Sequence, residues 1–185
     1  MLKNKIKIPE ISDTFNYKSL SKSYNSSGGI GVGNNIFSSN TYFQKFIPGK
    51  TFSISFIASD SDPVILGFNQ LFIVENNIKY PFLHAGAMII DFEQPYRGYM
   101  LDWIKAITKY YSLTGYISID FKIFSNNLEI LDINPRLSGS YRLYTRKYKN
   151  LMFNHMKPGD PLNLKSNDYF SYILSLIHIS EPTRP

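Results

Sequence analysis

The chain has 185 residues, of which 43% are hydrophobic and 16% aromatic; this composition excludes the disordered and collagen-like classes and predicts one globular domain or two small lobes. Its formal net charge of +6 comes from basic residues dispersed along the sequence, a pattern that does not favour nucleic acid and suits a nucleotide triphosphate equally well. The absence of cysteine excludes a disulfide framework, a thiolate zinc site and a thiol nucleophile.

The N-terminal residues give no sign of export. Lys3, Lys5 and Lys7 are followed by Pro9 and Glu10, so no apolar signal-peptide core develops. No apolar run approaches the roughly 20 residues that a helix needs to span a bilayer. We therefore expect a soluble, cytoplasmic protein without a membrane partner.

The first half of the chain is typical of short strands around a glycine-rich loop. Residues 22–35 are rich in Ser, Gly and Asn, a composition typical of loops, and a strand is expected just before them at 17–23. Three apolar runs follow, at 41–47, 51–58 and 64–74, separated by segments rich in Pro, Gly and Asp. These runs predict an antiparallel meander.

The second half predicts a helix, a hairpin and a further short helix. Residues 95–111 carry apolar side chains at helical spacing, which favours an amphipathic helix. Two apolar strands, 115–124 and 128–133, are joined through residues 125–127, whose Asn-Asn pair suits a tight hairpin. A short helix is expected after Pro135.

A glycine loop follows a lysine at the end of the first predicted strand. Lys22 precedes Gly28, Gly29 and Gly31; backbone amides next to glycines can surround phosphate oxygens, and the lysine adds a positive charge. The sequence lacks the downstream Lys-Ser/Thr and the strand-then-helix context of a Walker loop or a dinucleotide fingerprint. The loop alone is compatible with a phosphate site and with a flexible turn.

Oxygen-bearing side chains interrupt the two apolar strands of the predicted hairpin. Asp120 lies on the first strand, and alternation places Asp132, Asn134 and Arg136 on one face of the second and Glu129 on the other. Carboxylate and amide oxygens are ligands that Mg²⁺ prefers, with phosphate oxygens and water completing the shell. Arg136 can neutralise charge on a transferred phosphoryl group. The alternative is a pair of solvated strand-end carboxylates beside a capping Asn134.

Taken in chain order, these motifs resemble the ATP-grasp superfamily over residues 7–156. The motifs are Lys22 with its glycine loop, Phe43-Gln-Lys-Phe-Ile-Pro-Gly49, Ser53-Ile-Ser-Phe56, Gly115 to Asp120, and Asp132-Ile-Asn-Pro-Arg136. A Gly-Phe-Asn-Gln sequence at 67–70 is similar to that of ATP-grasp proteins among the carboxylate-amine ligase relatives. The resemblance implies an α+β ATP-grasp fold: an antiparallel-sheet lid lobe at 1–74, and a metal-binding lobe of antiparallel sheet and helix at 75–173. A preceding N-terminal domain is expected to be missing.

The resemblance also implies roles for individual residues. The implied nucleotide-binding residues are Lys22 on phosphate, Gly28, Gly29 and Gly31 as a lid over the triphosphate, and Gln44, Lys45, Phe46 and Ile47 as a hinge whose backbone pairs with adenine. The implied metal ligands are Asp120, Asp132 and Asn134, for Mg²⁺ or Mn²⁺. The implied catalytic residue is Arg136, which would stabilise an acyl-phosphate step. The implied reaction is ATP-dependent joining of a small-molecule carboxylate to an amine, with the two substrates and the oligomeric state left open.

Three positions depart from the family pattern. Lys45 stands at a hinge position that is commonly Glu. Asp132 replaces a more usual Glu and reaches one methylene less far. The first family lysine, upstream of the lid, has no match. Two other functions stay open, because fold does not decide function: an ATP-binding module without catalysis, and an ATP-grasp kinase acting on a non-carboxylate acceptor.

Residues 174–184 resemble a translated sequencing adapter, so residues 174–185 are expected to be a non-native tail. His178 is therefore excluded as a ligand. His84 is expected either to face the substrate cleft or to be structural, and with His155 as the other histidine a histidine metal site is not expected.

Overall fold

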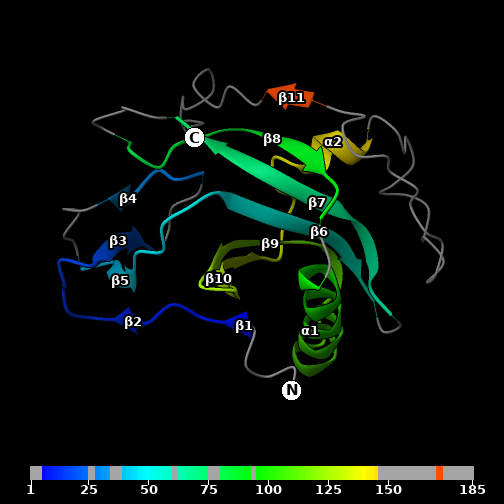
Figure 1. Cartoon of the computed structure of the whole chain (residues 1–185), viewed down its shortest axis with the longest axis horizontal. Helices are drawn as coiled ribbons and strands as arrows, with labels where there is room; N and C mark the ends of the chain where they lie inside the picture. The colour runs from blue at the N-terminus through cyan, green and yellow to red at the C-terminus, as the bar shows by residue number, and fades with distance from the viewer. Residues whose placement is uncertain are drawn as a thin grey trace, which may run out of the picture. The chain divides into compact units, whose positions relative to one another are not determined.

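The computed structural model describes residues 6–24, 28–33, 39–59, 62–74, 80–92, 95–145 and 170–172. The predicted tail, His155 and His178 lie outside these ranges. The chain divides into two compact units, each assembled from separate stretches. Figure 1 labels the helices and strands. Unit 1 comprises Met1–Pro9, Ile47–Leu71 and Ala87–Ser171, and unit 2 comprises Glu10–Phe46, Phe72–Gly86 and Tyr172–Pro185. The lobe boundary near residue 74 stays a prediction.

A seven-stranded sheet, in the order β1-β10-β9-β6-β7-β8-β11, forms most of unit 1. Its strands are β1 (Ile6–Lys7), β6 (Thr51–Ala58), β7 (Val64–Ile73), β8 (His84–Ile90), β9 (Gly115–Phe124), β10 (Asn127–Asn134) and β11 (Phe170–Tyr172). β6 pairs antiparallel with β7 and β9, β9 pairs antiparallel with β10, and β1 runs parallel to β10. The predicted β9–β10 hairpin and the β6–β7 part of the predicted meander are therefore confirmed, whereas β8 was not predicted.

One face of this sheet is apolar and is covered by α1 (Tyr96–Tyr111). Ile54, Phe56, Ile117, Ile119 and Phe121 alternate along β6 and β9 and are completely buried. They form one cluster with Met100, Ile104 and Ile107 of α1, which share a face of the helix because they are three or four residues apart. The predicted helix is confirmed. No helix in the described part of the chain is long and apolar enough to span a bilayer.

The opposite face of the sheet is polar at its centre. Thr51, Ser53 and Ser55 of β6 lie opposite Lys122, Asp120 and Ser118 of β9, and directly opposed residues of antiparallel strands share a face. At one end of this face α2 (Tyr141–Thr145) buries Leu143 and Tyr144 against Leu66, Ala87, Ile89 and Tyr116. The short helix predicted after Pro135 is thus confirmed.

Unit 2 contains an antiparallel four-stranded sheet in the order β2-β5-β3-β4. Its strands are β2 (Ile11–Ser12), β3 (Ser19–Ser23), β4 (Val32–Gly33) and β5 (Thr41–Lys45). β5 pairs with β2 and β3, so the prediction that it begins a meander with β6 and β7 is wrong. The break after β5 contains Gly49 with a φ of 102°, a conformation that lets the chain leave one sheet and enter another.

The β9–β10 turn carries local strain that a substitution can relieve. Ser125 and Asn126 both have positive φ, 49° and 61°, as in a type I′ turn. The αL conformation costs a residue with a Cβ about 1–2 kcal/mol. We expect Ser125→Gly to raise the free energy of unfolding by about 0.5–1 kcal/mol, since part of that gain is lost to the flexibility of glycine.

Urea denaturation measures this effect, with Thr114→Gly as the matched control. Thr114 is a loop residue outside the positive-φ group, so glycine there should lower stability. Equal or lower stability of Ser125→Gly would contradict the predicted strain.

Candidate functional site

Asp120 and Asp132 lie directly opposite each other in the β9–β10 hairpin. Asp120 is half-buried and Asp132 is exposed. Directly opposed side chains have Cβ atoms about 4.5–5.5 Å apart, and like charges in such a pair destabilise the sheet. A divalent cation between the two carboxylates would remove this repulsion.

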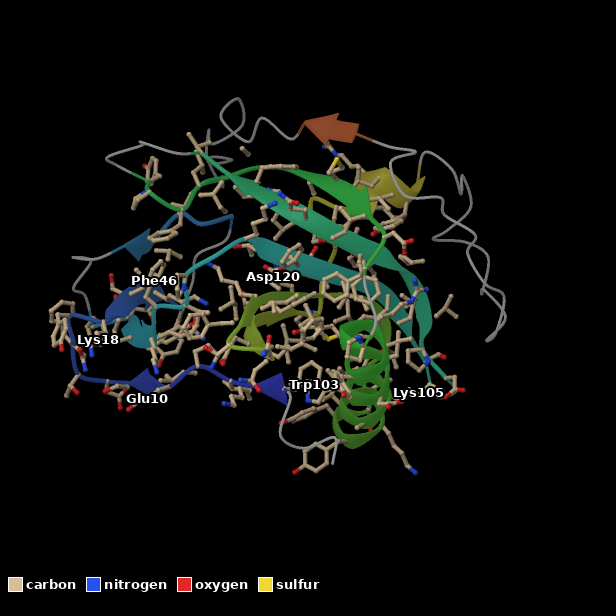
Figure 2. All side chains as sticks on the ribbon, viewed as in Figure 1. Glu10, Lys18, Phe46, Trp103, Lys105 and Asp120 are labelled. Carbon is tan, nitrogen blue, oxygen red and sulfur yellow. The ribbon has the colours of Figure 1, made fainter. Side chains whose placement is uncertain are left out.

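Asn134 and Arg136 join the two carboxylates at the end of β10. The Asn134 Nδ2 lies 3.5 Å from Asp120 Oδ2, and the Arg136 Nη2 donates to Asn134 Oδ1 over 3.0 Å. Arg136 lies two residues after the end of β10 and is exposed; its Nη1 also donates to the Leu137 carbonyl at 3.4 Å. The structure thus brings the predicted metal ligands and the predicted catalytic arginine together in unit 1. Asp120 is labelled in Figure 2.

A bulge in β10 changes which side chains share this face. The register shifts between Ile130 and Asp132, so that Glu129 lies opposite Lys122 and Asp132 opposite Asp120. Lys122 and Asp120 are two residues apart and share a face, and therefore Glu129 and Asp132 do too. The prediction that Glu129 points to the other face is wrong, because the extra residue, Leu131, resets the alternation.

The residues at this site fit a hard divalent cation. Two carboxylates and an amide oxygen suit Mg²⁺, which keeps several waters and takes further oxygens from a phosphate. Among the described residues no three His, Cys, Asp or Glu side chains could hold a metal alone. Ser118, opposite Asn134, is 1% exposed and its hydroxyl has no hydrogen-bond partner in the described part of the chain. Because buried polar atoms are normally hydrogen-bonded, this hydroxyl indicates that a polar group from outside the described residues binds at the site.

Lys122 is a site residue that sequence reasoning missed. Its Nζ donates to the carbonyl of Ile47 at 2.7 Å, so the last residue of the predicted hinge is bonded to the strand that carries Asp120. Burial lowers the pKa of Lys122. The sequence signal was a lone Lys in the apolar strand at 115–124, two residues after Asp120.

The predicted phosphate loop lies in unit 2, between β3 and β4. Gly28, Gly29 and Gly31 all have positive φ, 64°, 83° and 75°. A Cβ at Gly29 would stand 1.8 Å from the carbonyl oxygen of Phe82. Glycine at position 29 is therefore required by close backbone packing, whatever the loop binds.

Lys22 and Gln44, both predicted to bind nucleotide, are in contact. The Lys22 Nζ donates to Gln44 Oε1 at 3.3 Å, and it also lies 5.7 Å from the ring centre of Tyr42. The two residues meet because Lys22 and Gln44 lie on adjacent strands, β3 and β5, two register positions apart.

A pocket of about 570 Å³ lies in unit 2 beside the predicted hinge. It is lined by Phe15, Tyr17, Lys18, Ser19, Leu20, Lys45, Phe46 and Phe82. Four rings and two lysines suit a flat aromatic ligand that carries negative charge. Of these residues only Lys45 and Phe46 were predicted, and Lys18 and Phe46 are labelled in Figure 2.

The hinge backbone is partly committed to other hydrogen bonds. The Lys45 N–H donates to the Glu10 carbonyl at 2.9 Å, and the Phe46 N–H to the Lys18 carbonyl at 2.8 Å. Any adenine contact from these two residues would therefore use their other atoms. The division between units falls between Phe46 and Ile47, within the predicted hinge.

His84 lies next to the glycine loop, since its N–H donates to the Gly28 carbonyl at 2.9 Å. Burial lowers the pKa of His84 below its ordinary 6.5, although a hydrogen bond with the Gly86 backbone opposes the shift.

The lowered pKa of His84 predicts a pH-dependent stability. As the pH is lowered through 6.5, the imidazole binds a proton more readily in the unfolded chain than in the folded chain, so the folded state loses stability. Between pH 7 and 5 we expect the wild type to lose stability relative to His84→Gln in urea denaturation. A constant difference between the two would contradict this expectation.

The chain is similar to a known domain family. A family model described as an ATP-grasp domain matches residues 1–140. An uncharacterised protein of Methanocaldococcus jannaschii is 30% identical over 98 residues, which are 53% of this chain and 22% of that protein.

Three solved structures are similar to this chain. An ATP-grasp superfamily protein of Archaeoglobus fulgidus has a TM-score of 0.60 and 20% identity, with 78% of this chain and 46% of that chain covered. The L-amino acid ligase of Bacillus licheniformis has a TM-score of 0.58 and 12% identity, with 76% of this chain and 40% of that chain covered. The third is the biotin carboxylase domain of the 2-oxoglutarate carboxylase of Hydrogenobacter thermophilus, solved with MgADP and bicarbonate. It has a TM-score of 0.58 and 13% identity, with 75% of this chain and 39% of that chain covered. The chain spans less than half of each of these structures.

Proposed function

Because the chain belongs to the ATP-grasp domain family, and has the α+β fold that its sequence predicts, we propose that it is the nucleotide- and metal-binding part of an ATP-dependent ligase. The reaction would join a small-molecule carboxylate to an amine in the cytoplasm. The observation that carries this proposal is the meeting of Asp120, Asp132, Asn134 and Arg136 at one end of a hairpin.

The proposed reaction has two balanced steps. A carboxylate oxygen of the first substrate attacks the γ-phosphorus of ATP, the bond to the β-phosphate oxygen breaks, and ADP leaves. The nitrogen of the amine then attacks the acyl carbon, phosphate leaves, and the nitrogen loses a proton to give the amide. Both steps build negative charge on phosphate oxygens, which positioned cations can stabilise.

The residues of unit 1 would hold and neutralise the reacting phosphates. Asp120, Asp132 and Asn134 would hold Mg²⁺, which would supply positive charge to neutralise the reacting phosphates. Arg136, beside Asn134, presents a planar fork that can donate two parallel hydrogen bonds to a phosphoryl group. For the amide oxygen of Asn134 to reach the cation, the Arg136 guanidinium must share that oxygen or turn toward the phosphoryl group.

Unit 2 has its own residues that suit a nucleotide. The pocket lined by Phe46, Lys18 and Lys45 suits an adenine nucleotide. Its aromatic rings can stack on the faces of the adenine base, and its lysines attract the negative charge of nearby phosphates. Lys22 and the loop from Gly28 to Gly31 would contact the triphosphate. These assignments rest on the pocket and on the Lys22 to Gln44 contact.

One experiment separates this proposal from its two rivals. The chain is incubated with ATP, Mg²⁺ and a panel of amino acids and small dicarboxylates, with hydroxylamine present to trap acyl phosphate. ADP together with a hydroxamate supports the ligase. ADP with a phosphorylated acceptor and no hydroxamate indicates a kinase, and bound ATP without ADP indicates a binding module.

A further inference from the structure

Asn69 is a completely buried amide on the same face of the sheet as the proposed metal ligands. It lies in β7 opposite Ser53 of β6, which lies opposite Asp120 of β9. Its exposed fraction is 0%. A buried amide is unfavourable unless its hydrogen bonds are satisfied, so its partners indicate what it holds.

The two ends of this amide bind different parts of unit 1. The Asn69 Nδ2 lies 3.1 Å from Ser53 Oγ and 3.5 Å from Ser55 Oγ, both on β6. The Tyr144 hydroxyl, from α2, donates to Asn69 Oδ1 at 2.7 Å. Asn69 therefore connects the centre of the sheet to the helix that follows Ser140.

A cluster of hydroxyl groups continues from Ser55 to the segment before that helix. The Tyr116 hydroxyl donates to Ser55 Oγ at 2.9 Å and lies 3.0 Å from Ser138 Oγ and 3.3 Å from Ser140 Oγ. Ser140 Oγ is also 3.2 Å from Ser55 Oγ and 2.8 Å from Ser138 Oγ. Residues 138–140 are thus held to the sheet by hydrogen bonds that are buried at Ser140 and partly buried at Ser138.

Arg136 lies in the segment that these contacts fix. The segment begins after Asn134, is anchored at Ser138 and Ser140, and continues into α2, which Tyr144 ties to Asn69. Arg136 itself is exposed, and its side-chain bonds go to Asn134 and to the Leu137 carbonyl. Its guanidinium is therefore held by one bond from within this segment, to the Leu137 carbonyl, and by one from the end of β10, to Asn134.

We propose that Asn69 is a positioning residue: through Tyr144 and the Tyr116–serine cluster it fixes residues 135–140 so that Arg136 faces the phosphoryl group beside Asp120. The proposal rests on the proposed function for the identity of that group. The amide is required because one end must donate to Ser53 and the other must accept from Tyr144. A carboxylate at this position would lack the donor and bury a charge.

Two variants and one control test this proposal in the full chain. Tyr144→Phe removes one hydroxyl and keeps the ring, and Asn69→Asp removes the amide donor. Tyr96→Phe removes a tyrosine hydroxyl that contacts Asn126 on the surface. The readouts are the Arg136 side-chain Nε–H resonance in NMR spectra, and kcat and KM for Mg²⁺-ATP turnover.

We expect both variants to shift or broaden the Arg136 resonance and to lower kcat by about 10-fold or more, the usual range for residues supporting a site. KM for ATP should stay within about two-fold, since these residues do not touch the nucleotide pocket. Tyr96→Phe should match the wild type in both readouts.

The contradicting result is distinct from failure of the proposed function. If Tyr144→Phe lowers thermal stability but leaves the Arg136 resonance as in the wild type, Asn69 only supports packing and the proposal is overturned. The resonance requires no turnover, so it decides the positioning role even if the chain hydrolyses no ATP. Absence of ATP turnover in the wild type would count against the proposed function alone.

Discussion

Asp120→Asn should lower Mg²⁺-dependent ATP turnover by about two to three orders of magnitude. The substitution keeps the size of the side chain but removes one of the two negative charges that face each other across β9 and β10. A metal ion contributes several kcal/mol to transition-state stabilisation, and about 1.4 kcal/mol corresponds to a factor of ten in rate. The loss should be partly recovered at high Mg²⁺ concentration, since the ion would be bound more weakly.

Asp102→Asn is the matched control for this change. Asp102 is an exposed acid on α1, in the same unit of the protein, and its substitution alters the net charge equally. ADP release is measured over a series of Mg²⁺ concentrations for both variants. Equal turnover and equal Mg²⁺ dependence of the two variants would show that Asp120 holds no catalytic metal.

Arg136→Lys should lower kcat by about two orders of magnitude while ATP affinity stays within a few-fold. Lysine keeps the charge but loses the planar fork that lets arginine contact Asn134 and a phosphoryl oxygen together. Loss of one donor to a developing oxyanion costs roughly 10²–10³ in rate. The effect should fall on kcat because the contact forms with charge that develops during transfer.

The control for arginine chemistry is Arg97→Lys. Arg97 is exposed on α1, where it lies 3.7 Å from Asp91, so its substitution makes the same chemical change at the surface. Steady-state kinetics with varied ATP separate kcat from KM. An Arg136→Lys variant that loses ATP affinity but keeps kcat would assign Arg136 to ground-state binding.

Local sequence patterns predicted the central hairpins and the long helix. Residues 51–58 and 115–124 alternate polar and apolar side chains, which is sufficient to define strands with one polar face. Met100, Ile104 and Ile107 repeat at helical spacing, so α1 was predicted nearly to its observed bounds. The proximity of Asp120, Asp132 and Asn134 followed because a tight hairpin joins their strands.

Features that depend on distant contacts were not predictable in this way. Leu131 is apolar like Leu128 and Ile130 before it, so nothing in the sequence indicated the bulge that brings Glu129 to the polar face. The requirement for glycine at position 29 arises from the Phe82 carbonyl, which approaches from a separate segment. The role of Asn69 depends on Tyr144, a partner that only the folded chain reveals.

Mg²⁺-dependent ATP binding, measured by calorimetry on the full chain, tests the central claim most directly. The Asp132→Ala, Asn134→Ala double variant is compared with an Asp102→Ala, Asn127→Ala control, which removes an acid and an amide elsewhere in unit 1. We predict that the wild type and the control bind ATP in the presence of Mg²⁺ and that the double variant does not. Absence of binding by the folded wild type, or equal binding by all three proteins, would contradict the assignment of this hairpin as the metal and nucleotide site.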